Sequence, residues 1–266
     1  MESAVDYWTA RALLEWQVEM GADEAILDAP VDRFAAVAEA AAAQPVAASN
    51  AQLPKGPPPV PAPIEVDPVA EAAKIAGTVT SLDQLRQALS EFDHCKLKSG
   101  ARNLVFGDGN PAARVMIIGE APGREEDGEG RPFIGQAGQM LDRMLAAIGL
   151  DRSSPDPARS VYITNVMPWR PVADRTPEPA DVAMMVPFVQ AHIRLIDPDF
   201  IVLMGNTSCQ ALLGQTGVTR LRGTWAKVLD KPALPMLHPA YLLRQTSAKR
   251  EAWADLLSLK SQLRSR

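Results

Sequence analysis

The chain has 266 residues, 47% of them hydrophobic, and a formal net charge of −5. That length suffices for one sizeable α/β domain plus an appendage. The longest apolar runs are too short to span a bilayer, and the N-terminus lacks the basic and apolar regions of a secretory signal, so we expect a cytoplasmic protein without a membrane partner. Two cysteines exclude a disulfide framework and cannot by themselves form a four-ligand metal site.

The charge is unevenly distributed along the chain. Residues 1–74 carry 4 Lys/Arg and 12 Asp/Glu, a balance of −8, whereas residues 75–266 carry 23 and 20, a balance of +3. The body of the protein is therefore mildly basic and the appendage is acidic. Mild basicity permits contacts with phosphate groups but does not establish a nucleic-acid partner.

The pattern along the first part of the chain predicts three segments. Residues 1–43 form a helical N-terminal arm, with an amphipathic helix over 4–20 and an alanine-rich helix over 32–43. Residues 44–68 are a Pro/Ala-rich linker, which is too extended to build a core. The main domain covers 69–266 and begins with helical sequence up to Phe92, in which Ser81 is a good N-cap.

Strand and helix patterns then alternate, which predicts the α/β class with a parallel sheet covered on both faces. Each of four apolar runs ends in a polar loop and predicts a buried strand: Arg114–Gly119, Val161–Val166, Phe200–Gly205 and Ala233–Leu237. The helical stretches that follow them in turn are Gln136–Ile148, Pro179–Ile196, Thr207–Leu213 and Lys249–Arg264. The connection after the first strand, from Gly119 to Gly135, is unusually polar and rich in glycine, which is typical of a functional loop.

Chemically useful side chains follow the strands of this predicted sheet. Glu120 follows the first strand, Phe133 lies further along its loop, Asn165 lies near the end of the second, and His238 follows the fourth. Because the carboxyl ends of parallel strands share one edge, these groups should converge there. Taken singly, each has a plain structural interpretation: a solvated or capping carboxylate, a turn amide, a core ring and a structural histidine.

Four motifs and their spacing resemble the family 4 uracil-DNA glycosylases. They are CKLKSGARNLVFGDGNP, GEAPGREED with RPFIG, TNVMPWRP and HPAYLLR, and the resemblance covers Leu85 to the C-terminus. It implies a three-layer α/β/α sandwich on a four-stranded parallel sheet. It also implies a monomeric DNA-repair enzyme that hydrolyses the N-glycosidic bond of uracil flipped out of DNA.

The resemblance also suggests a role for each site residue. Phe133 would stack on the base, Asn165 would read its Watson–Crick edge, and His238 would donate a hydrogen bond to uracil O2. Glu120 and Glu126 are both candidates for positioning the attacking water, and the sequence does not rank them. The remaining positions expected at the substrate are Gly119, Pro122, Gly123 and Tyr241.

The HPAYLLR motif has a second implied role, in contacting DNA. Tyr241, Leu242 and Leu243 lie where the family inserts an apolar wedge into the base stack, and Arg244 lies nearby for a phosphate. Core residues of a short helix are an equally good interpretation of Leu242 and Leu243.

The chain departs from the family at the iron–sulfur cluster. Family 4 enzymes usually hold a [4Fe–4S] cluster with four cysteines, and these positions fall on Phe92, Cys95, Trp169 and Met185. Iron–sulfur clusters need thiolates, so we expect neither a cofactor nor a metal site, and an apolar plug instead.

Two other functions stay open at this point. One is a damaged-base binding protein that has lost turnover together with its cluster, although retention of Glu120, Asn165 and His238 argues against it. The other is a glycosylase for a different deaminated base, hypoxanthine or xanthine, which depends on the volume of the pocket.

Overall fold

A computed structural model describes Arg11, Leu13 and residues 67–265. Apart from Arg11 and Leu13, the expected arm helices therefore lie outside the described residues, as does almost all of the expected linker. The architecture below is that of residues 67–265.

Four parallel strands form the centre of the sheet, as the sequence predicted. The strand order is β1-β3-β2-β4-β6-β5, in which β3, β2, β4 and β6 are parallel. These four strands are β2 (Val115–Gly119), β3 (Val161–Asn165), β4 (Phe200–Met204) and β6 (Lys231–Met236). Every residue of β2, β3 and β4 is buried, because helices cover both faces of the sheet.

Two short antiparallel strands at the sheet edges were not predicted. β1 (Asp108–Gly109) pairs with β3, and β5 (Ala226–Val228) pairs with β6. Two or three residues are too few to show an alternating pattern, so neither strand is visible in the sequence. Pairing with β5 also explains why β6 begins at Lys231 rather than at the predicted Ala233.

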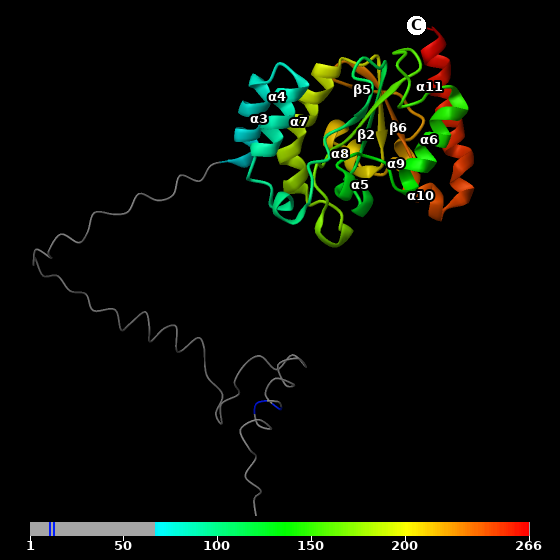
Figure 1. Ribbon diagram of the computed structural model, residues 1–266. Coiled ribbons are helices and arrows are strands. Elements are labelled where there is room, and N and C mark those ends of the chain that lie inside the picture. Colours follow the sequence, from blue (N-terminus) through cyan, green and yellow to red (C-terminus); the bar gives the residue numbers. More distant parts are fainter. Residues whose placement is uncertain (1–10, 12, 14–66, 266) are drawn as a thin grey trace, which may run out of the picture. The chain divides into compact units, whose positions relative to one another are not determined.

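Helices cover the two faces of the sheet in separate groups (Figure 1). On one face α3 and α4 pack on α7, which in turn packs on α8; on the other, α6 packs against α10 and α11. The α-helices are α3 (Pro68–Thr78), α4 (Leu82–Glu91), α5 (Arg124–Glu129), α6 (Gln136–Ile148), α7 (Pro179–Ile196), α8 (Asn206–Leu213), α9 (Val218–Leu221), α10 (Pro239–Arg244) and α11 (Lys249–Ser265). The short 3₁₀ helices are η1 (Lys96–Gly100), η2 (Val172–Asp174) and η3 (Thr246–Ala248). None of the helices among the described residues is both long and apolar enough to cross a membrane.

Helix boundaries follow local capping chemistry. Ser81 is the N-cap of α4, and its side chain accepts a hydrogen bond from the Gln84 amide at 3.2 Å, as predicted. Asp67 caps α3 in the same way through the Val69 amide at 2.9 Å. The predicted bounds of α6 and α7 agree with the structure, because both helices are long and periodic.

The structure corrects one loop of the sequence interpretation. The acidic cluster after Gly123 is not loop but the short helix α5, which begins at Arg124. α5 is only six residues long, too short for periodicity to reveal it. The HPAYLLR motif forms the short helix α10, for which His238 is the N-cap, in agreement with the short-helix interpretation of Leu242 and Leu243.

A buried histidine on α7 joins that helix to β3. The Tyr162 hydroxyl lies 2.9 Å from His192 Nε2, and the Phe106 ring stacks on the imidazole at 4.5 Å. Burial, with a contribution from the Arg86 cation, lowers the pKa of His192 to about 3. His192 is therefore a neutral core residue, in agreement with the absence of any functional motif around it.

We expect this histidine to make stability depend on pH. Its folded pKa lies below the unfolded value, so the unfolded state takes up a proton first and stability is lost as pH falls below about 6.5. For this one group, the free energy of unfolding should fall by up to about 1.4 kcal/mol for each unit by which the pH is lowered. Urea unfolding between pH 7.5 and 5 measures it. His192→Gln should reduce the slope to the part contributed by His238, whose pKa is also lowered, whereas His94→Gln, at an exposed histidine, should leave the slope unchanged; equal slopes in both variants would contradict the assignment.

Candidate active site

A cavity of about 450 Å³ opens at the carboxyl ends of the parallel strands. Loops after β2, β3 and β6 contribute to it, together with α5 and α10, which lie at the same end of the domain (Figure 1). Its lining includes nine residues predicted for the site: Glu120, Pro122, Gly123, Glu126, Phe133, Asn165, His238, Tyr241 and Arg244. The predicted convergence of these side chains is therefore seen in the structure.

Gly119 forms the floor beneath two of these side chains. It ends β2 and is paired in register with Asn165 of β3. A Cβ atom at this position would overlap Asn165 Oδ1 and the ring of Phe133. Only glycine therefore leaves room for both groups.

Phe133 is buried beside His238 in an unusual backbone conformation. Its φ is 54°, a left-handed value that costs a bulky L-residue about 1–2 kcal/mol. The centroids of the Phe133 and His238 rings lie 5.4 Å apart. The strained conformation places an aromatic face in the pocket, where a planar base can stack on it.

Asn165 presents an unused acceptor. The residue is buried, and its Oδ1 is the one fully buried polar side-chain atom among the described residues that has no hydrogen-bond partner. Such an orphan is costly unless a ligand supplies the missing donor. Since Asn165 lines the pocket, a water molecule or a ligand bound there can supply the missing donor to this oxygen.

His238 is held as a neutral hydrogen-bond donor. Its Nδ1 accepts from the Ala240 amide at 3.2 Å, so in the neutral ring the proton lies on Nε2. Burial, reinforced by the Arg244 cation and opposed by Glu126, lowers the pKa of His238 to about 4. Near neutral pH the side chain therefore offers an uncharged Nε2–H.

The structure distinguishes the two candidate carboxylates. Glu126 Oε2 accepts from the Gly123 amide at 3.1 Å, and its Oε1 accepts from the Ile134 and Gly135 amides at 3.1 and 3.0 Å. Its oxygens are thus engaged in holding the loop. Glu120 lines the same cavity and makes no hydrogen bond through its carboxylate to any described residue, so that carboxylate is available to a ligand or water.

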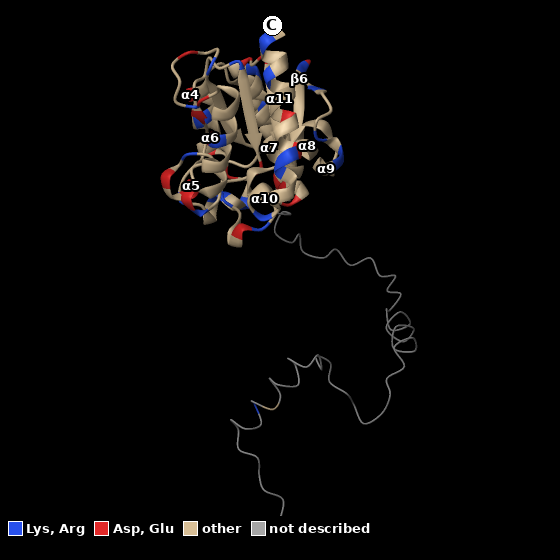
Figure 2. Cartoon of the chain, turned by 90° about the vertical axis from the view of Figure 1, so that its right-hand side faces the viewer, with Lys and Arg blue, Asp and Glu red and all other residues tan. Residues whose placement is uncertain are grey.

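The rim of the pocket contains α10 and shows which residues can reach DNA. Tyr241 and Leu243 are 37% and 38% exposed, and Arg244, also exposed, ends the helix. Leu242, in contrast, is 0% exposed and belongs to the core, which agrees with the alternative interpretation of this residue as a core residue of a short helix rather than a DNA wedge. Figure 2 shows that acidic residues are concentrated on α5 at this end of the domain.

Six residues that line the cavity were not predicted from the sequence. They are Ala121, Ala137, Pro171, Asp174, Arg175 and Ala240. Three come from the loop after β3, where Arg170 forms a paired contact with Asp174 at 2.7 and 2.9 Å. Asp174 has a φ of 53°. The sequence Pro168-Trp169-Arg170-Pro171 lies in this loop, but which side chains face the cavity depends on the fold of the loop.

The residues at the four cluster positions do not match the chemistry of an iron–sulfur site. Phe92, Cys95, Trp169 and Met185 are all at least 98% buried and belong to the hydrophobic core. Phe92 packs edge-to-face on Phe188, with centroids 5.1 Å apart. Burial, with a contribution from Asp181, also raises the pKa of the Cys95 thiol. One thiol whose ionisation is disfavoured cannot stand in for four thiolates.

The absence of a cluster is therefore a prediction about the purified protein. We expect a colourless preparation without stoichiometric iron, even when it is expressed with added iron and purified without oxygen. Elemental analysis and the visible absorption spectrum measure this directly. Iron bound at four atoms per chain, with the absorption of a cluster, would contradict it.

The fold and the site together define a class: an α/β/α sandwich with a cavity of about 450 Å³, lined by both polar and apolar side chains, at the carboxyl ends of its parallel strands. Comparison with known proteins is more specific. Residues 106–257 match the model of the uracil DNA glycosylase superfamily. The chain belongs to that superfamily.

Several curated relatives are similar over most of their length. A type-4 uracil-DNA glycosylase of Thermotoga maritima is 39% identical over 156 residues, which is 58% of this chain and 78% of the relative. The type-4 enzyme of Sulfurisphaera tokodaii is 36% identical over 61% of this chain and 76% of the relative. That of Archaeoglobus fulgidus is 34% identical over 66% of this chain and 89% of the relative.

Proposed function

We propose that this protein is a uracil-DNA glycosylase, which hydrolyses the N-glycosidic bond of a flipped-out uracil and leaves an abasic site. The observation that carries the proposal is the orphaned Oδ1 of Asn165, buried in a pocket with an aromatic face and a neutral imidazole donor. Membership of the superfamily and the similarity to type-4 enzymes support the same activity. A base inside a duplex is inaccessible, so the target must first be extruded into the pocket.

Asn165 is the proposed reader of the base. Its Oδ1 would accept the N3–H of uracil, which supplies the donor that the protein lacks, and its Nδ2 would donate to O4. Cytosine presents the opposite pattern and would leave both groups unpaired. Phe133 would hold the same base by stacking.

His238 and Glu120 are the proposed catalytic groups. Cleavage leaves negative charge on uracil, and the neutral Nε2–H of His238 can donate to uracil O2 as that charge develops. Positive charge develops on the sugar, and the Glu120 carboxylate can oppose it and orient the attacking water. Glu126 has a structural role in this proposal, because its carboxylate binds the backbone of the loop that carries Phe133.

The exposed part of α10 is the proposed contact with DNA. Tyr241 and Leu243 are partly exposed apolar groups beside the pocket, suited to stabilise the gap left by the flipped nucleotide. Arg244 can bind a phosphate. We further infer a monomeric cytoplasmic enzyme that acts on uracil-containing DNA.

The test is release of uracil from DNA by the purified full chain. Oligonucleotides with a single uracil, incubated with the protein in EDTA and then treated with alkali, should break at that position, because none of the proposed steps uses a metal ion. Otherwise identical oligonucleotides with cytosine or thymine should stay intact. Binding of uracil DNA without scission would instead favour the damaged-base binding protein. Scission only at hypoxanthine or xanthine would favour the alternative substrate.

A further inference from the structure

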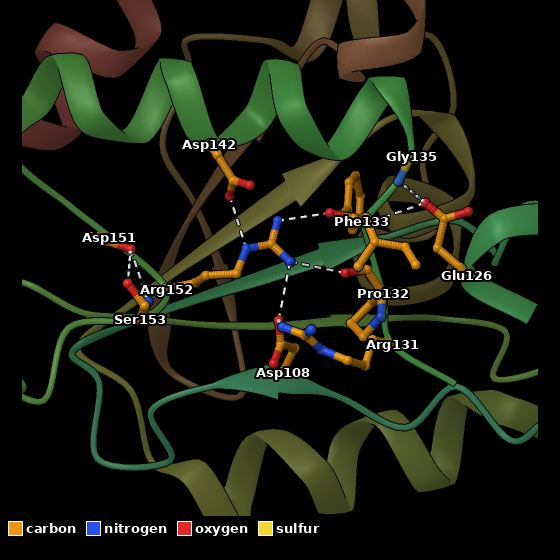
Figure 3. A network of polar contacts seen from close by, with 11 residues as sticks. Asp108, Glu126, Arg131, Pro132, Phe133, Gly135, Asp142, Asp151, Arg152 and Ser153 are labelled. Atoms are coloured by element: carbon orange, nitrogen blue, oxygen red, sulfur yellow. Dashed lines mark hydrogen bonds and ion pairs between the residues drawn. The ribbon is translucent and has the colours of Figure 1, made fainter. Parts of the chain in front are cut away.

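We infer that Arg152 is a positioning residue that fixes Phe133 for stacking on the flipped base, a role that rests on the proposed function. The side chain of Arg152 is 10% exposed and lies behind the pocket rather than in its lining. It acts on the backbone of the loop that carries the ring. Figure 3 shows the guanidinium at the centre of this network.

Two donors of the guanidinium bind consecutive carbonyl groups of that loop. Nη2 of Arg152 donates to the Phe133 carbonyl at 2.8 Å, and Nη1 donates to the Pro132 carbonyl at 3.0 Å (Figure 3). Both contacts are of normal hydrogen-bond length and involve a charged donor, which makes them stronger than neutral ones. A shift of the Phe133 backbone therefore breaks a charge-assisted bond.

Two carboxylates fix the guanidinium itself. Its Nε donates to Asp142 of α6 at 2.8 Å, and Nη1 also contacts Asp108 of β1 at 3.2 Å. Asp108 accepts a further hydrogen bond at 3.0 Å from Arg131, which is the residue before Pro132. The buried cation is thus compensated and anchored to a helix and to the sheet edge (Figure 3), which makes it a rigid support for the loop.

The loop needs such a support because its conformation is strained. Phe133 has a left-handed backbone that a free loop would leave. Its carbonyl also passes so close to Gly138 of α6 that a Cβ atom there would overlap it. The Glu126 carboxylate accepts hydrogen bonds from the amides of Ile134 and Gly135. Together with the two carbonyls bound by Arg152, four successive residues of the loop, 132–135, are therefore held by one anion and one cation.

Lysine cannot reproduce this geometry. The planar fork of arginine reaches two carbonyls and two carboxylates at once, whereas an ammonium group is a single point of charge. Arg152→Lys should therefore keep the charge balance with Asp108 and Asp142 but lose part of the grip on the loop. This makes it a milder variant than Arg152→Met.

The experiment measures binding to two DNA duplexes that differ only in the presence of a base to stack. One contains a deoxyuridine fluorinated on the sugar, which resists cleavage, and the other contains an abasic analogue. We expect Arg152→Met to weaken binding of the uracil duplex by about 5–50-fold, the scale of lost stacking, and to change abasic binding by less than about twofold. Arg159→Met, at an exposed arginine in the same α6–β3 connection, should change neither.

A double-mutant cycle decides whether Arg152 acts through Phe133. If it does, Arg152→Met should add less than about twofold to the effect of Phe133→Ala. The inference would be overturned if the losses of affinity caused by Arg152→Met and Phe133→Ala multiply in the double variant. It would also be overturned if Arg152→Met weakens binding of both duplexes equally, or binds the uracil duplex as tightly as the wild type. If Arg152→Met fails to fold, as judged by its thermal transition, Arg152→Lys takes its place in the same cycle. A wild-type protein without preference for the uracil duplex would instead refute the proposed function, and the inference with it.

Discussion

Replacement of His238 by alanine should lower the rate of uracil release by about 10²–10³-fold while leaving the affinity for uracil DNA near the wild-type value. The reason lies in when the hydrogen bond matters. Uracil O2 in the intact nucleotide is a weak acceptor, and it becomes a strong one only as the glycosidic bond breaks. A donor that is fixed in place before that moment therefore stabilises the transition state more than the bound ground state.

The structure explains why alanine removes this effect completely. The Nε2–H points from a ring whose Nδ1 is already bound to the Ala240 amide, so the tautomer is set before substrate arrives. With a pKa of about 4, the ring is uncharged near neutral pH and does not form an ion pair with the DNA phosphates. Loss of the side chain should thus affect turnover rather than electrostatic attraction.

Single-turnover rates beside equilibrium binding on one uracil oligonucleotide measure the two effects separately. His94→Ala is the matched control, because His94 is an exposed histidine outside the pocket and should keep the wild-type rate. If His238→Ala cleaves as fast as the wild type, the histidine is structural. If it loses affinity and rate equally, its contact is made in the ground state.

The predictable part of this fold is the part encoded by long apolar runs. The strands β2, β3 and β4 are buried on both faces, so their sequences are mostly apolar, and the ends of each strand lie within one residue of the predicted ends. The edge strands β1 and β5 depend on pairing partners rather than on their own composition. Convergence of Glu120, Asn165 and His238 then followed from topology alone.

What escaped prediction depends on the direction of individual side chains. Sequence placed Glu120 and Glu126 on one loop, but only the hydrogen bonds of Glu126 show that its carboxylate is occupied. Leu242 and Leu243 are adjacent and chemically identical, yet one is core and the other partly exposed. Arg152 gave no signal at all, because it lies in a turn before β3 and contacts residues 10 to 44 positions away in sequence.

The largest change in specificity should come from Asn165→Asp. At this buried position an ionised carboxylate offers two acceptors and no donor, so it can take the N3–H of uracil but repels O4. A site built around hydrogen bonds to its substrate rejects the mismatched partner by about 10⁴-fold or more, and we expect a loss of uracil cleavage on that scale. The substitution is almost isosteric, so it should leave Gly119 and Phe133 in place.

Cytosine gives the reciprocal test. Burial favours the protonated form of a carboxyl group, and a protonated aspartic acid presents one donor and one acceptor, which can match N3 and N4 of cytosine or N3 and O4 of uracil. The variant should therefore cleave cytosine slowly, where the wild type does not, and its cleavage of both bases should rise as pH is lowered and the carboxylate is protonated. Single-turnover assays on uracil and cytosine oligonucleotides between pH 5 and 8 measure both effects.

Asn206→Asp, just after β4, is the matched control. Asn206 Oδ1 accepts hydrogen bonds from the Gly217 and Val218 amides at 3.1 and 2.8 Å, and a carboxylate oxygen can accept the same two bonds. Uracil cleavage by Asn165→Asp at the rate of Asn206→Asp would show that the amide does not read the base.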